Sequence, residues 1–190
     1  MGALDQKNAA YFSDTFNFLK DQSKECIEEL VAVGTINLTS PSPLKDDQKG
    51  LYKCTIEFKV PFGTFVVAVS YGFSIAEQIV AEKYQHHKEK LREDMTRDLF
   101  SEYLNLFMGR IKRCYGSEDA DASVPVTEPT TVQASGAPSA APSSDTWQFE
   151  WKGHHVVMVC DLAVNDDADL STINHDENEE DSQPGEIDFF

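Results

Sequence analysis

The sequence predicts an α+β fold in which a mostly antiparallel sheet packs with long helices. Apolar residues recur at helical spacing over two long segments, residues 4–33 and 91–114. Two other segments, residues 52–71 and 147–164, each contain two strand patterns separated by a short turn. Such short turns join antiparallel neighbours, so we expect both hairpins to belong to an antiparallel sheet.

The size and charge of the chain limit its organisation and its partners. Its 190 residues fit one domain with a tail, and the formal net charge is −17. Because nothing resembles a compensating basic patch, we expect repulsion from nucleic acid and anionic membranes, and therefore protein or cationic partners. No signal peptide pattern opens the chain, and no apolar run approaches the roughly 20 residues of a membrane span. These features predict a cytoplasmic protein without membrane insertion.

The four cysteines support the same compartment. Cys26, Cys54, Cys114 and Cys160 are scattered, without a C-x-x-C pair or a nearby histidine cluster at metal-ligand spacing. Cys54 and Cys160 lie within apolar alternation and are expected to be buried. We predict no disulfide framework and no metal site.

The first half of the chain contains a long helix followed by a hairpin. The helix is predicted over Leu4–Val33 with Gly34 as its stop, and Thr35–Thr39 has strand character. Tyr52–Val60 alternates cleanly between apolar and polar residues. Thr64–Tyr71 follows after a tight connection and is apolar on both faces. We therefore expect this second strand near the centre of the sheet.

A short helix is predicted next, from Ser74 to about Tyr84. Ser74 is the expected N-cap, with Glu77 as its capping-box partner. His86 and His87 follow in a charged stretch. Adjacent residues point to different sides of a helix, so we expect this pair to be solvent-exposed or structural instead of a metal site.

The second half contains the other long helix, a loop and the second hairpin. Residues 117–146 are rich in Ser, Pro, Ala, Thr and Asp and predict a loop insert, with a short edge strand at residues 131–133. Trp147–Trp151 and His154–Val164 predict the final hairpin. We place the folded domain at residues 1–164. Residues 165–190 contain ten acids and no Lys or Arg, which predicts a disordered tail.

The helix at residues 91–114 carries a polar stripe. At about 100° per residue, one side collects Asp98, Glu102, Asn105, Gly109 and Lys112. The opposite side collects apolar residues, namely Phe100, Tyr103, Leu104, Phe107 and Ile111. A glycine within a helix costs about 1 kcal/mol relative to alanine, so Gly109 indicates a place where another backbone approaches.

The stripe has two interpretations. Leu99 and Leu106 lie on one shoulder of it and are expected to give a docking partner apolar contact. On that interpretation the helix is an insertion surface. The alternative is an ordinary solvated helix face, since Glu-x-x-Asn also occurs by chance.

The motif resembles that of a known family. The pattern Asp98-x3-Glu102-x2-Asn105-x3-Gly109, followed about two dozen residues later by Pro129, resembles the CheC/CheX/FliY family of chemotaxis phosphatases. The order of elements over residues 4–164 is similar to the CheX-type domain, which also has one Glu-x-x-Asn signature. The Ala/Pro/Ser-rich insert departs from the compact loop that is usual in the family.

The resemblance implies an activity. Family members hydrolyse the phospho-aspartate of CheY-like response-regulator receiver domains. The receiver supplies Mg²⁺ and a lysine, so this chain is expected to need no cofactor of its own. The resemblance implies that Asn105 orients the attacking water and that Glu102 pairs with the lysine of the receiver, while Asp98 contributes to the partner-binding surface. It is also compatible with a homodimer.

The end of the tail has a resemblance of its own. Residues 182–190 resemble the short acidic–apolar peptide of the flagellar switch protein FliM, which binds activated CheY. The resemblance implies that the tail tethers the same receiver through its last five residues, namely Glu186, Ile187, Asp188, Phe189 and Phe190. The alternative is a tail that serves solubility alone.

Two other functions stay open at the level of sequence. One is a noncatalytic adaptor that binds a receiver or a flagellar switch component. The other is a structural dimer with a vestigial signature helix, which the intact Glu102 and Asn105 make less attractive.

Overall fold

The structure is a computed structural model that describes residues 3–31, 34–44, 47–84, 89–116, 122–130, 143–166, 168–170 and 173. Three helices and six strands occur in this part of the chain. In order they are α1 (Ala3–Leu30), β1 (Asn37–Thr39), β2 (Leu51–Val60), β3 (Gly63–Gly72), α2 (Phe73–Lys83), α3 (Glu89–Cys114), β4 (Val126–Thr130), β5 (Ser144–Trp151) and β6 (His154–Val164).

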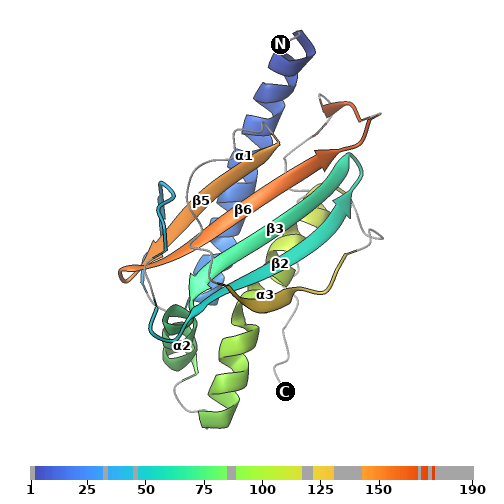
Figure 1. The fold of residues 1–190 in the computed structure, drawn as a ribbon. Helices are drawn as coiled ribbons and strands as arrows, with labels where there is room; N and C mark the ends of the chain where they lie inside the picture. The colour runs from blue at the N-terminus through green and yellow to red at the C-terminus, as the bar shows by residue number, and fades with distance from the viewer. Residues whose placement is uncertain are drawn as a thin grey trace.

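The strands form a single antiparallel sheet in the order β1-β5-β6-β3-β2-β4. Figure 1 shows α1 and α3 on the same face of this sheet, with α2 at one end. β3 lies between β6 and β2, as its apolar character on both faces predicts. The α+β prediction is confirmed, because hairpin-linked strands pair with each other and long amphipathic helices cover one face.

The main core lies between the sheet and the two long helices. β2 contributes alternate buried residues, and the bulky aromatic side chains of β3, β5 and α3 fill the centre. Ser23 of α1 joins three elements there. Its hydroxyl accepts a hydrogen bond from Trp147 Nε1 at 2.9 Å, and its backbone oxygen accepts one from Tyr103 Oη at 3.2 Å. Tyr103 is fully buried, so this bond holds α3 with its apolar side toward the core.

The segment after α3 differs from the prediction of a loop insert. β4 occupies Val126–Thr130 within it and, among the described residues, pairs with β2 as an edge strand. Only two of its side chains are partly buried, so its alternation is too weak to find in the sequence. The edge strand expected at residues 131–133 lies outside the described residues. Beyond the predicted boundary at Val164, Leu170 still packs into the core with 6% of its surface exposed.

The start of α2 also differs, because Ser74 is not its N-cap. The cap position is Gly72, and a carboxylate from a preceding loop takes over the capping role. Asp47 accepts hydrogen bonds from the backbone N–H and the hydroxyl of Ser74, each at 2.8 Å. A Cβ at Gly72 would lie 2.4 Å from Asp47 Oδ2, so the glycine makes room for this contact.

The capping box predicted between Ser74 and Glu77 therefore does not form. Glu77 pairs with Lys49 at 2.5 Å instead. His86 and His87 lie outside the described residues. No helix in the part of the chain described above is long and apolar enough to cross a membrane.

Candidate functional site

The predicted polar stripe lies on the exposed side of α3. Asp98, Glu102 and Asn105 are all exposed. The five apolar residues of the opposite side are fully buried, at 0% exposure each. The helical periodicity of the sequence therefore placed the two signature side chains correctly on the surface.

Two contacts on opposite sides hold the stripe in this orientation. Arg110 bonds Glu25 of α1 at 2.6 Å and also pairs with Glu29. On the other side, Ser101 Oγ lies 3.1 Å from Thr127 Oγ1 of β4. Rotation of α3 about its axis would break one contact or the other, so the pair fixes the direction in which the stripe faces.

Leu99 does not lie on a docking surface, which corrects one prediction. Its exposure is only 5%, and it belongs to the main core. Both α1 and α2 pack against α3, so the buried arc of the helix is wider than the side that periodicity indicates. Leu106 is partly buried against the same core and keeps some surface.

Within the described part of the chain, no neighbouring atom requires position 109 to be a glycine. A Cβ at this position would meet only Arg113 Nη1, at 4.0 Å. The space beside Gly109 is therefore open, and α3 does not need a glycine there in order to fold. This is the arrangement expected if another molecule approaches the helix at that point.

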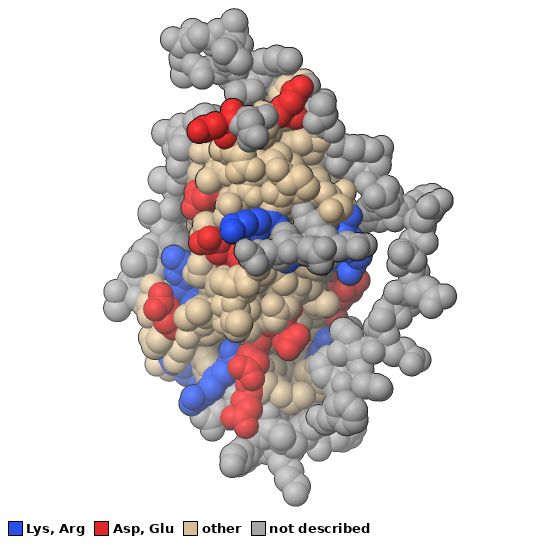
Figure 2. Space-filling model, turned by 90° about the vertical axis from the view of Figure 1, so that its right-hand side faces the viewer, with Lys and Arg blue, Asp and Glu red and all other residues tan. Residues whose placement is uncertain are grey.

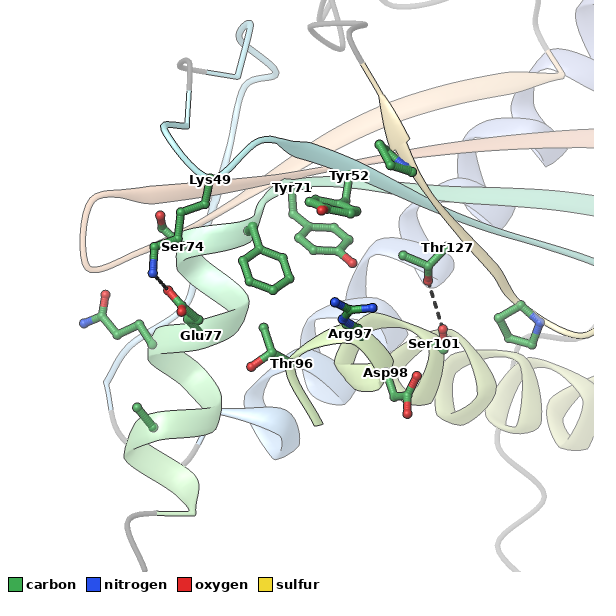
Figure 3. Close-up of a pocket in the computed structure, with 15 residues that line it drawn as sticks. Lys49, Tyr52, Tyr71, Ser74, Glu77, Thr96, Arg97, Asp98, Ser101 and Thr127 are labelled. Atoms are coloured by element: carbon green, nitrogen blue, oxygen red, sulfur yellow. Dashed lines mark hydrogen bonds and ion pairs between the residues drawn. The ribbon is translucent and has the colours of Figure 1, made fainter. Parts of the chain in front are cut away.

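A large pocket of about 1270 Å³ adjoins the stripe. Its lining residues come from α2, α3, β4 and the adjoining ends of β2 and β3 (Figure 3). Asp98 belongs to both the stripe and the pocket, whereas Glu102 and Asn105 do not line the pocket. The predicted pair therefore lies on an open surface beside the cavity, which suits a protein partner better than an enclosed small substrate.

The pocket combines aromatic rings with balanced charge. The ring centroids of Tyr52 and Phe73 are 5.2 Å apart, and Tyr71 packs beside Tyr52 at 6.1 Å. Figure 3 shows Arg97 beneath the two tyrosine rings, pointing into the pocket. Burial raises the pKa of Tyr71 well above its ordinary value, so its hydroxyl stays protonated.

Sequence reasoning missed Tyr84, which lies near the signature glutamate. Burial, and then the charge of Glu102, raise the pKa of Tyr84. Tyr84 is the C-cap of α2, so α2 ends close to the stripe. Tyr84 and Glu102 belong to different helices, so no regular spacing in the sequence links them.

Pro129 lies in β4, where it pairs with Tyr52 of β2. Edge strands tolerate proline because one side of the strand needs no ladder hydrogen bond. Pro129 and Asp98 line the same pocket. The proline chosen from the sequence and the signature helix thus meet at one cavity.

The remaining site predictions concern the tail, the thiols and metals. Residues 186–190 lie outside the described residues. Cys26, Cys54 and Cys160 are buried, and burial raises the pKa of Cys26 to about 12, so this thiol is a poor nucleophile. Within the described residues no group of three or more His, Cys, Asp and Glu side chains is arranged to hold a metal ion.

Comparison with known proteins gives no match by sequence. No protein-family model and no curated protein matches this chain. The fold, by contrast, matches solved structures clearly.

Several solved chemotaxis proteins share the fold. CheX from a Borrelia burgdorferi CheX–CheY–BeF3–Mg²⁺ complex matches at a TM-score of 0.56 with 13% identity, over 77% of this chain and 96% of the other. CheX from Vibrio vulnificus matches at 0.53 with 14% identity, over 77% and 97%. A CheC-like protein from Shewanella oneidensis matches at 0.55 with 15% identity, over 77% and 96%.

The likeness confirms at the level of fold the resemblance that the motif on α3 indicated. The chain is a CheX/CheC-like protein in fold.

Proposed function

We propose that this chain is a phosphatase that hydrolyses the phospho-aspartate of a CheY-like receiver domain. The observation that carries the proposal is the exposure of Glu102 and Asn105 together on one clamped helix face. This helix belongs to a domain that shares its fold with chemotaxis proteins, one of them crystallised with CheY. Sequence identity near 13% makes the activity a proposal and not a transfer from those proteins.

The spacing of Glu102 and Asn105 allows both side chains to contact one small area of a partner. Three residues along a helix correspond to a rise of about 4.5 Å and a rotation of about 60° between the two Cα directions. Glu102 and Asn105 therefore reach toward neighbouring points of one partner surface. The clamps at Arg110 and Ser101 keep that direction fixed, which favours positioning of a reacting group.

In the proposed reaction, a water oxygen attacks the phosphorus in line with the bond to the aspartate oxygen. That bond breaks, and the products are the aspartate carboxylate and inorganic phosphate. The amide of Asn105 orients the water, since it both donates and accepts hydrogen bonds without changing its protonation state. Glu102 pairs with the lysine of the receiver and sets the register of docking. The receiver's own Mg²⁺ stabilises the transferring phosphoryl charge.

The test compares signature variants with matched variants elsewhere on a helix. The receiver is phosphorylated with a small-molecule phosphodonor, and phosphate release is followed after the donor is removed. We expect Glu102→Ala and Asn105→Ala each to reduce the acceleration by roughly 100-fold, the scale of a lost positioning group. Glu28→Ala and Asn17→Ala, at exposed positions of α1, are expected to behave as wild type.

The adaptor is the alternative function, and the same assay separates the two. If the wild-type chain binds the receiver but does not accelerate phosphate release, the phosphatase proposal is wrong and the adaptor is supported. The exposed stripe and the open space beside Gly109 suit either kind of docking.

Three further expectations belong to this proposal. The buried free thiols suit a reducing compartment, and we infer a cytoplasmic location. A homodimer is expected from the CheX-like fold, and β1 and β4 are the outer strands of the sheet at which pairing is proposed. Residues 186–190 are proposed to tether the receiver, so their deletion should raise KM without changing kcat.

A further inference from the structure

The stripe alone is too small to hold a protein partner. From Asp98 to Gly109 it extends about 16 Å at 1.5 Å per residue, and it is one side chain wide. A stable protein interface covers about 800 Å² on each partner. A receiver domain that reaches Asn105 must therefore contact additional surface beside α3.

One flank of the stripe is already occupied by the fold. On that side Arg110 is bound to Glu25 and Glu29 of α1, and Leu99 is buried. A partner would meet a closed helix–helix contact there. The additional surface has to come from the other flank.

The other flank opens into the pocket between α2, α3 and β4. Asp98 lines this pocket, so the stripe and the cavity are continuous. Its walls have a regular construction. Four residues of α2 form one wall at helical spacing, namely Ser74, Glu77, Gln78 and Ala81. Alternate residues at and before β4 form the other, namely Pro125, Thr127 and Pro129.

The floor of the pocket is suited to an apolar or aromatic segment. The half-buried rings of Tyr52 and Phe73 lie there with centroids 5.2 Å apart. Aromatic side chains dominate the energetics of docking surfaces and pair well with other rings.

The charge of the pocket lining is balanced, so it provides no net attraction for an anionic occupant. Its lining contains Lys49 and Arg97 together with Glu77 and Asp98, and Lys49 is paired with Glu77 at 2.5 Å. The local charge is balanced within a chain of net charge −17. Figure 2 shows basic and acidic side chains intermixed on the face at the right-hand side of Figure 1. The chain's own tail, with ten acids, matches this surface poorly, whereas an uncharged segment matches it well.

We propose that this pocket is a second docking surface for the receiver domain. It takes an apolar or aromatic segment of that domain while Glu102 and Asn105 engage the phosphorylation site. The identity of the partner rests on the proposed function, but the surface itself acts through binding and not through hydrolysis. Variants that fill the pocket should therefore weaken binding and leave the chemical step intact.

The experiment fills the pocket from Ala81, which is exposed on α2 and lines the cavity. Ala81→Leu and Ala81→Trp add increasing volume without removing a polar side chain. Ala10→Trp, at an exposed alanine of α1, is the matched control. The measurements are the Kd for receiver activated with beryllium fluoride and Mg²⁺, and kcat and KM for phosphorylated receiver. Thermal unfolding verifies that each variant is folded.

We expect Ala81→Trp to raise Kd and KM about 10-fold and Ala81→Leu to raise them by less. We expect kcat to stay within twofold of wild type. Ala10→Trp should leave all three quantities unchanged. An unchanged Kd for folded Ala81→Trp would overturn the proposal, and so would a wild-type chain that binds no receiver.

The two proposals fail in different ways. Weaker binding in Ala81→Trp together with no hydrolysis by wild type would support the docking surface and refute the phosphatase. Loss of hydrolysis in Asn105→Ala together with normal binding in Ala81→Trp would support the phosphatase and refute the docking surface. If Ala81→Trp and deletion of residues 182–190 both tighten receiver binding, the pocket holds the chain's own tail and the receiver is the wrong occupant.

Discussion

The hydroxyl oxygens of Ser101 and Thr127 lie 3.1 Å apart and join α3 to β4 directly beside the signature stripe. Cys54 Sγ of β2 lies 3.5 Å from the same Ser101 hydroxyl. One side chain thus connects the helix to two strands, one turn before Asn105. Because Asn105 is exposed, such contacts, and not its own packing, determine where its amide lies.

Removal of the Ser101 hydroxyl should therefore affect catalysis more than binding. For Ser101→Ala we expect kcat to fall about fivefold with KM unchanged, and stability to fall by about 1 kcal/mol, the usual contribution of one hydrogen bond. Ser101→Thr keeps the hydroxyl and should restore kcat. Ser13→Ala, exposed on α1, is the control. A rise in KM alone would contradict a positioning role.

Asp47 should make stability depend on pH at the acid end. Burial raises its pKa, but hydrogen bonds from the backbone N–H groups of Lys49 and Ser74 and from the Ser74 hydroxyl outweigh it. The pKa therefore lies below its ordinary value. A lowered folded-state pKa stabilises the fold above the unfolded value of about 3.9, and this stabilisation is lost as the pH falls through the folded-state pKa.

Asp47→Asn should accordingly cost about 1 kcal/mol near neutral pH, because both carboxylate oxygens accept hydrogen bonds and the amide nitrogen that replaces one of them cannot. Its loss of stability between about pH 5 and pH 2 should be shallower than that of wild type. Urea unfolding across this range measures both effects. Asp14→Asn, exposed on α1, should keep the wild-type slope. An equal acid slope in Asp47→Asn would show that the capping contact does not titrate as described.

Substitution of Gly109 should have opposite effects on the stability of the fold and on receiver binding. Alanine at this position meets only Arg113 Nη1 at 4.0 Å, so Gly109→Ala should stabilise the fold by up to about 1 kcal/mol through helix propensity. If the open space beside Gly109 receives a partner, the same change should weaken receiver binding several-fold. Thermal unfolding and the Kd for activated receiver test the two parts independently.

Gly72→Ala is the contrasting glycine variant. Its Cβ would lie 2.4 Å from Asp47 Oδ2, so we expect destabilisation instead of stabilisation. Together the two variants distinguish a glycine that the fold requires from one that it does not. Tighter or unchanged receiver binding by Gly109→Ala would remove the argument that this glycine serves docking.

The periodicity of the sequence is enough to indicate which side of α3 faces the solvent. A period of 3.6 residues is a local property, so it predicts Phe100 and Tyr103 for the core and Glu102 and Asn105 for the surface, and the structure agrees. The central place of β3 followed in the same way from its apolar residues on both faces.

The width of the buried arc of α3 and the surroundings of the stripe depend on tertiary packing. Leu99 is buried in the core that forms where α1 and α2 pack against α3, and no local period records that packing. Asp47 caps α2 from a distant loop, in place of the Ser74 cap that the local motif indicated. The pocket brings together β2, β3, β4, α2 and α3, which are far apart in the chain, so no sequence motif joins their lining residues. Contacts between helices and strands depend on how these elements pack together. The hydrophobic pattern of the sequence indicates only which side of each helix or strand faces the core.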